Sequence, residues 1–244
     1  MLKNFLDRLL ELARPETVEI EGLKYSTGKL SLIGEPRPVG LSLGSLTSLD
    51  DYLRSGLDLQ SARTTTSDLS WLALHVRGPA RVDLLSKLSG PERGRDVYAS
   101  ADCEVEARFK FGVFLPQEHF VIGMQTMFAQ TDELRQLLSI VGMVTCDEIE
   151  TRSDDGVTQT ATMKVGVTLQ SRADIPSPVT LRPYRTFREI KQPESPFVLR
   201  VRKGLTGVEL ALFEADGGAW KTRAMEDIKV WLETALPYGP LVIA

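Results

Sequence analysis

Cysteine and histidine are scarce in this chain, with two of each among 244 residues. Neither Cys103 nor Cys146 has a second Cys or His at metal-ligand spacing, which argues against a structural zinc site. A disulfide between them stays open, although two cysteines in a chain of this size are more often reduced and buried. His75 and His119 are isolated as well. We therefore expect no metal site, and the scarcity of histidine argues against histidine-dependent catalysis.

Long apolar runs are also missing: no stretch of about 18 apolar residues occurs, so the sequence predicts no membrane span. Residues 1–14 place apolar residues at helical spacing with charged residues between them, which predicts an amphipathic helix ended by Pro15. That helix would dock on the core or form an arm that binds another subunit. A secretory signal needs an uninterrupted apolar core, so we expect a cytoplasmic protein.

Glycine-rich phosphate-binding sequences are absent, because neither a Walker sequence nor G-x-G-x-x-G occurs. We therefore expect no nucleotide cofactor, and none of another kind is indicated. The composition, with 42% hydrophobic and 25% charged residues, is that of a folded protein with a self-sufficient core. Its length fits one large domain or two small ones.

Helical and alternating patterns are mixed along the chain. Apart from residues 1–14, the spacing predicts helices over 45–56, 116–130, 131–142 and 220–236. Extended segments are expected over 17–25, 29–34, 68–79 and 97–114, with hairpins over 145–167 and 196–215. Regular βαβ alternation is absent, so we expect an α+β fold of mixed or antiparallel hairpins with several helices.

Two of these helices carry start signals. Thr47 begins an S/T-x-x-D sequence and is expected to cap the helix over 45–56. Thr131 is expected to cap the next-but-one helix, with Gly142 as its stop. Between them, Phe120, Met124, Met127 and Phe128 lie at helical spacing, and this stripe is more typical of a core than of a cofactor site.

Two catalytic patterns are weak. Gly40-Leu41-Ser42-Leu43-Gly44 matches the G-x-S-x-G nucleophile elbow, but its approach is proline-rich and no histidine is placed to meet it. Asp174, Glu189 and Lys191 have the residue types of a metal-dependent nuclease, although such short patterns are common by chance.

A third cluster is acidic: it comprises Asp147, Glu148, Glu150, Asp154 and Asp155. It has no EF-hand order, and a solvated hairpin around its turn explains it better than a cation site.

The charge is unevenly distributed. The whole chain carries −4, yet residues 182–203 hold seven basic and only two acidic residues. This basic segment lies in a proline-rich stretch over 174–203 and contains aromatic residues between its cations. Its candidate binding residues are Arg182, Tyr184, Arg185, Phe187, Arg188, Lys191, Arg200, Arg202 and Lys203. Arginines beside aromatics can pair phosphates and stack on bases. Pairing with the acidic hairpin, within the chain or between subunits, is an alternative, and a solvated surface is another.

Several segments resemble a known family. DDGVTQ at 154–159, the stretches over 177–202 and 211–233, and FGVFLPQEHFVIGMQTMF at 111–128 are similar to the YfdQ-like family of phage and prophage proteins, a domain of unknown function. The resemblance runs across residues 1–244 in order, so a single domain over 1–244 is expected. It implies action in the cytoplasm of a host bacterium, in replication, recombination or host takeover, and it supplies no catalytic residues.

Together these observations favour a non-enzymatic viral accessory protein of the early or host-takeover type. It would self-associate as a homo-oligomer and bind a partner, such as a nucleic acid or an acidic host protein, through the basic segment. The alternatives are a DNA- or RNA-binding accessory factor of replication or recombination and a metal-dependent nuclease.

Overall fold

A computed structural model describes residues 17–20, 23–26, 38–59, 69–90, 93–104, 108–150, 159–165, 169–175, 177–205 and 207–244. The chain divides into two compact units, residues 1–37 and 38–244. In the first unit, β1 (Thr17–Ile20) and β2 (Leu23–Ser26) pair antiparallel. The helix expected over residues 1–14 lies outside the described residues. Because the two units are described separately, a single domain over 1–244 stays a prediction.

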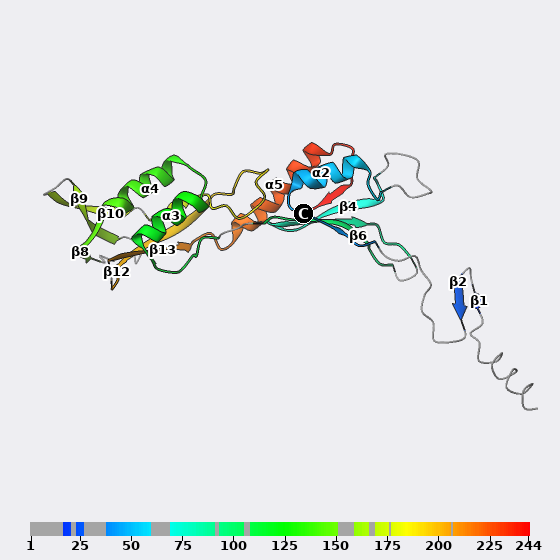
Figure 1. Cartoon of the computed structure of the whole chain (residues 1–244), viewed down its shortest axis with the longest axis horizontal. Coiled ribbons are helices and arrows are strands. Elements are labelled where there is room, and N and C mark those ends of the chain that lie inside the picture. Colours follow the sequence, from blue (N-terminus) through cyan, green and yellow to red (C-terminus); the bar gives the residue numbers. More distant parts are fainter. Residues whose placement is uncertain are drawn as a thin grey trace, which may run out of the picture. The chain divides into compact units, whose positions relative to one another are not determined.

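The second unit contains helices together with mixed and antiparallel sheets, which confirms the α+β class (Figure 1). One sheet has the order β14-β4-β5-β6-β3. Its strands are β3 (Leu41–Leu43), β4 (Leu72–Gly78), β5 (Arg81–Ser86), β6 (Val97–Asp102) and β14 (Leu241–Ile243). Both edge strands pair parallel to their neighbours, whereas the three central strands form an antiparallel meander.

Two helices, α2 (Leu46–Ser55) and α5 (Ala219–Ala235), pack on this sheet and bury its first core. Leu72, Leu74 and Val76 point into that core, as their alternation predicts. The start of α2 differs from expectation: Ser45 is the N-cap and accepts the Ser48 amide, while Thr47 lies inside the first turn. Gly56 ends α2 with φ of 65°, a left-handed conformation that glycine adopts without strain.

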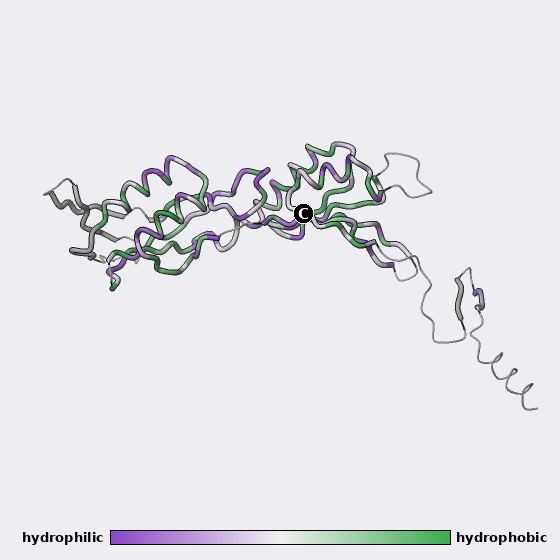
Figure 2. The backbone as a smooth tube through the Cα atoms, viewed as in Figure 1, coloured by the Kyte–Doolittle hydropathy of each residue, from purple (hydrophilic) through white to green (hydrophobic). Residues whose placement is uncertain are grey.

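The second sheet has the order β11-β12-β13-β7 and bears the second core. Its strands are β7 (Leu115–Pro116), β11 (Val179–Leu181), β12 (Ser195–Lys203) and β13 (Val208–Glu214). The helices α3 (Gln117–Met127) and α4 (Asp132–Met143) pack on one of its faces. Figure 2 shows hydrophobic and hydrophilic residues interspersed along these elements, as amphipathic packing requires.

Aromatic side chains dominate this second core. Phe109 makes edge-to-face contacts with Phe120 and Phe128, whose ring centroids lie 5.6 and 5.1 Å away. Phe120, Met124 and Phe128 are fully buried, which confirms the core stripe predicted from their spacing. Thr131 caps α4 by accepting the Leu134 amide at 3.2 Å, as predicted. The helix continues past the expected stop, Gly142, to Met143.

Three further strands form a separate antiparallel sheet of order β10-β9-β8. The expected hairpin over 145–167 corresponds to β8 (Val144–Glu150) and β9 (Gln159–Val165), and β10 (Leu169–Ile175) adds a strand that the sequence did not indicate. The extended segment expected over 97–114 is shorter than predicted, because β6 ends at Asp102 and residues 108–114 form no strand. None of the described helices has both the length and the apolar composition needed to cross a bilayer.

Candidate functional site

The first half of the basic segment connects the two cores of the second unit. On the side of the second core, the Ala129 amide donates to the Arg182 carbonyl at 2.8 Å and the Tyr184 amide donates to the Met127 carbonyl at 2.9 Å. On the other side, the Thr186 hydroxyl donates to the Pro79 carbonyl, and Phe187 and Ile190 enter the first core. Residues 182–192, which we call the strap, therefore contact both cores and have a structural role.

A buried glutamine holds this strap in shape. Gln192 is 6% exposed, and its Oε1 accepts the amides of Arg185 at 3.0 Å and Thr186 at 3.3 Å. Its Nε2 donates to the carbonyls of Thr186 at 3.3 Å and Phe187 at 3.0 Å. One side chain thus satisfies four backbone groups that would otherwise be buried without partners, which fixes the turn over residues 185–187.

Arg185 lies inside the protein rather than on its surface. Its guanidinium is stacked 3.9 Å from the centroid of Trp220, donates to Glu214 at 2.7 Å and also bonds Ser195. Burial lowers the pKa of Arg185, and the carboxylates of Glu214 and Asp216 counteract this shift. This candidate binding residue joins the strap to β13 and α5.

Asp216 extends the same network into α5. Its carboxylate accepts the Ser195 hydroxyl at 2.8 Å and the Gly218 amide at 2.9 Å. Burial alone would raise the pKa of Asp216. These hydrogen bonds and the charge of Arg185 lower it by more than burial raises it, so the net shift is downward. The Asp216-Gly217-Gly218 turn is thus occupied by its own aspartate, and no anion is needed to explain it.

Other members of the basic segment are buried or form local salt bridges. Phe187, one of the candidate binding residues, is 1% exposed and packs in the first core, so it is not available for binding at the surface. Arg182 pairs with Glu194, and Arg202 pairs with Glu209 at 2.7 Å. The partners observed for these arginines are local glutamates. The side chains of the acidic cluster over 147–155 lie outside the described part of the structure.

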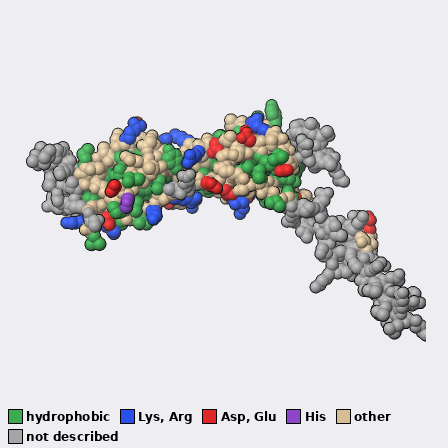
Figure 3. Space-filling view, in the orientation of Figure 1, with side chains coloured by type: hydrophobic (Ala, Val, Ile, Leu, Met, Phe, Trp, Pro, Cys, Tyr) green, Lys and Arg blue, Asp and Glu red, His purple; other side chains and the backbone are tan. Residues whose placement is uncertain are grey.

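What the segment still presents to solvent is a smaller set, which we call the exposed basic set: Tyr184, Arg188, Lys191, Arg202 and Lys203. Arg188 and Lys191 form no salt bridge with any described residue. Tyr184 is 42% exposed. Figure 3 shows Lys and Arg side chains distributed among hydrophobic ones on the part built from α3, α4, β12 and β13.

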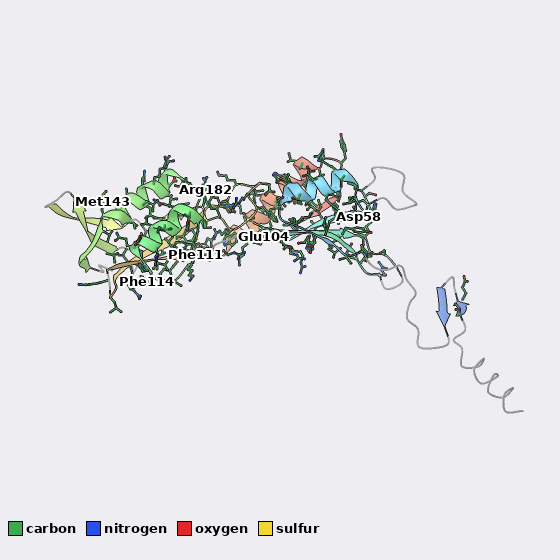
Figure 4. The ribbon with its side chains drawn as sticks, viewed as in Figure 1. Asp58, Glu104, Phe111, Phe114, Met143 and Arg182 are labelled. Atoms are coloured by element: carbon green, nitrogen blue, oxygen red, sulfur yellow. The ribbon has the colours of Figure 1, made fainter. Side chains whose placement is uncertain are left out.

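Tyr184 and Arg188 also line a cavity of about 650 Å³. Its wall combines apolar and polar groups from the end of α3, the strap and the residues after β6, and Figure 4 labels Glu104 there. The other lining residues are Cys103, Thr126, Met127, Ala129, Thr186, Ile190 and Gln192. A volume of this size suits a small molecule or one residue of a polymer.

Cys103 is not set up as a nucleophile in this cavity. Burial raises the pKa of its thiol, the charge of Glu189 raises it further, and Arg108 and Arg188 offset part of that shift. The thiol is therefore protonated at neutral pH, and the thiolate that attacks in cysteine catalysis is disfavoured. The cavity has the groups for binding rather than for covalent chemistry.

Arg200 and Arg202 of the basic segment lie on the face of the second sheet opposite α3 and α4. Along β12, Phe197, Leu199 and Val201 enter the core, so Arg200 and Arg202 point to the other side. Phe213 of β13 lies on this same side, opposite Val198 in the register. Figure 4 shows Phe114 on the side of β13 away from both helices.

Phe114, Phe213 and Gln192 lie in or beside the basic segment in the structure, and the sequence did not single them out. The alternation of β13 carries a signal for Phe213, because Leu210 and Leu212 face inward and put residue 213 outward. No comparable signal exists for Phe114, since it precedes a strand of only two residues.

The structure separates the residues of both catalytic patterns. Ser42 is exposed on β3, while His75 is on β4, with β6 and β5 between them, so their backbones are about 14 Å apart at the usual strand spacing. The Glu189 carboxylate accepts the Thr47 amide at 3.0 Å, at the start of α2. Asp174 lies on β10, in the sheet of order β10-β9-β8. Among the described side chains, no three of His, Cys, Asp or Glu gather as metal ligands.

Comparisons with family models, with curated proteins and with solved structures found no match.

Proposed function

We propose that the protein is a non-enzymatic accessory protein of phage or prophage origin that binds an anionic partner through the exposed basic set. Its place of action would be the cytoplasm of the host bacterium. The observation that carries the proposal is the exposure of Arg188 and Lys191 without a salt bridge to any described residue, beside the exposed ring of Tyr184. Exposed cations on a braced loop that form no salt bridge with described residues are available to an external anion.

The geometry of the strap supports this proposal. Gln192 and Thr186 fix the loop that carries Tyr184 and Arg188, so little side-chain and loop ordering is left for the binding step. The same cavity contains no activated nucleophile among its described groups, because the Cys103 thiol is held protonated. Binding therefore fits the local chemistry better than catalysis does.

Self-association is the second part of the proposal, and β14 supports it. This edge strand exposes Leu241 by 68% and Ile243 by 46%, while Val242 enters the core. An edge strand with unpaired backbone groups and exposed apolar side chains is a template for pairing with a second copy. Light scattering after size exclusion would give a mass above one chain, reduced by Leu241→Lys; a monomer at every protein and salt concentration would end this part.

Retention on heparin–agarose tests the binding part with a polyanion that has no bases. We expect the wild type to bind at low ionic strength and Arg188→Glu/Lys191→Glu to elute at lower salt. The control is Arg135→Glu/Arg223→Glu, which makes the same change of net charge at exposed positions of α4 and α5. Flow-through of the wild type, or an equal shift of both double variants, would contradict a specific site.

A further inference from the structure

The face of the second sheet opposite α3 and α4 gives the partner a more definite chemistry. We define this open face by four residues on the side of the second sheet away from α3 and α4, none of them buried: Phe114, Arg202, Glu209 and Phe213. We infer that the open face binds single-stranded nucleic acid by stacking bases on Phe213 and on the Arg202 guanidinium. This inference rests on the proposed function, since it identifies the anionic partner of the exposed basic set.

The register places these residues in rows across the sheet. Val198 is opposite Phe213, Arg200 is opposite Ala211, and Arg202 is opposite Glu209, which in turn is opposite Pro116 of β7. The side chains of α3 and α4 fill the other face with the second core. Ala211 itself is buried, so the open face consists of the Phe114 and Phe213 rings together with the Arg202 guanidinium.

Two stacking positions follow from the ring geometry. The Arg202 guanidinium lies 3.9 Å from the centroid of Phe114, so one side of that ring is covered and the outer plane of the guanidinium is presented in its place. The ring of Phe213 is 37% exposed and meets Phe114 edge-to-face, with centroids 6.3 Å apart. Phe213 and Arg202 therefore offer separate planar surfaces to two bases.

The backbone fixes the segment that carries Phe114. The Gly112 amide donates to the Leu212 carbonyl at 2.7 Å, which ties this segment to β13 next to Phe213. Gly112 has φ of 71°, a left-handed conformation, and a Cβ placed there would lie 3.8 Å from the Phe213 ring. The two phenylalanines are therefore positioned before a ligand arrives, which lowers the ordering cost of stacking.

Aromatic rings on an open sheet face beside cations are the means by which proteins bind unstacked bases. A duplex keeps its bases stacked inside, so exposed rings gain little from it and only its phosphates would contribute. An acidic protein would use the cations but not the ring planes. The combination of exposed rings and arginine therefore favours single strands over both.

The negative charge of Glu209 opposes the binding of an anion on this face. Removing that charge should therefore strengthen binding, whereas the other variants weaken it. The Glu209 carboxylate pairs with Arg202, whose side chain is 56% exposed, and exposed pairs of this kind are weak enough to exchange for a phosphate. Removing the carboxylate charge with Glu209→Gln leaves the guanidinium and the rings in place. This variant is expected to bind single strands more tightly than the wild type.

Fluorescence anisotropy with labelled oligo-dT measures the affinity directly. Phe213→Ala is expected to weaken binding by about 5- to 100-fold, the usual effect of losing one stacking ring. Phe213→Leu, which keeps apolar bulk but has no ring, should behave like the alanine variant and guards against a simple packing defect. Ile122→Ala on α3, 49% exposed on the other layer, and Arg135→Gln on α4 are the controls.

Four results decide the inference. Weakening by both Phe213 variants, tightening by Glu209→Gln, unchanged controls and weaker binding of a labelled duplex support it. Equal affinity for duplex and single strand, or unchanged affinity of Phe213→Ala, overturns it while retention on heparin leaves the proposed function intact. Binding to neither heparin nor oligo-dT overturns both.

Discussion

Gln192 gives the sharpest test of how the basic segment is held. Replacing it with alanine removes the acceptor for the Arg185 and Thr186 amides and the donor for two carbonyls, all in a region where the glutamine itself is 6% exposed. Each buried amide left without a partner costs about 1–3 kcal/mol, so the two together are expected to lower the free energy of unfolding by about 2–6 kcal/mol.

Urea denaturation followed by circular dichroism measures this loss, and the midpoint should fall at an unchanged slope. The matched control is Lys191→Ala, next in the chain but exposed, which is expected to change stability by less than about 0.5 kcal/mol. If Gln192→Ala unfolds at the same urea concentration as the wild type, the glutamine does not hold the strap, and the reasoning about residues 185–187 is wrong.

A second substitution separates the acceptor from the donor. Gln192→Glu keeps an oxygen for the two amides but places a carboxylate against the carbonyls of Thr186 and Phe187. Burial and these carbonyls raise the folded-state pKa of the introduced carboxyl above its unfolded value of about 4.3. The variant is therefore expected to regain stability as the pH falls through that raised pKa, whereas equal deficits at pH 7 and in mild acid would contradict the account.

Three further predictions concern other parts of the chain. Burial alone would raise the pKa of Asp83, but hydrogen bonds from serine and arginine side chains lower it by more than burial raises it, so its net shift is downward. The stability that Asp83 contributes is present above its unfolded pKa of about 3.9 and is lost as pH falls through its lower folded pKa. Asp83→Asn should therefore flatten the acid limb of a pH–stability curve, and an unchanged limb would count against this. Ser45→Ala removes the side-chain cap of α2 and should lower the free energy of unfolding by about 1 kcal/mol in urea titrations. An unchanged free energy of unfolding would contradict the capping role of Ser45. In a Cys146→Ser background, Cys103 should react with iodoacetamide more slowly than a free thiol and faster after Glu189→Gln, because that carboxylate raises its pKa; equal rates would refute the assignment.

Local signals were sufficient for the elements whose stability is local. The cap Thr131, the stripe of Phe120, Met124 and Phe128, and the hairpin of β12 and β13 follow from spacing and turn residues near one another in the chain. The same reasoning misplaced the start of α2, because Ser45 and Thr47 have equal capping chemistry and packing of Leu46 and Leu49 in the core selects between them.

Long-range pairing was beyond the sequence. Nothing local indicates that β14 joins β4 in parallel, or that β3 joins β6, because each partner is far away in the chain. The fate of the basic segment shows the same limit. Arg185 and Arg188 are the same residue type in similar local sequence, yet Arg185 is buried against Trp220 and Arg188 is exposed. Only the tertiary path of the strap distinguishes them.

The most direct test of the central claim is the affinity of the wild type for labelled oligo-dT across a salt series. We predict binding at low ionic strength, with the logarithm of the association constant falling linearly against the logarithm of salt concentration, and a shallower slope for Arg188→Gln because one phosphate contact is lost. No anisotropy change at any salt concentration would contradict it.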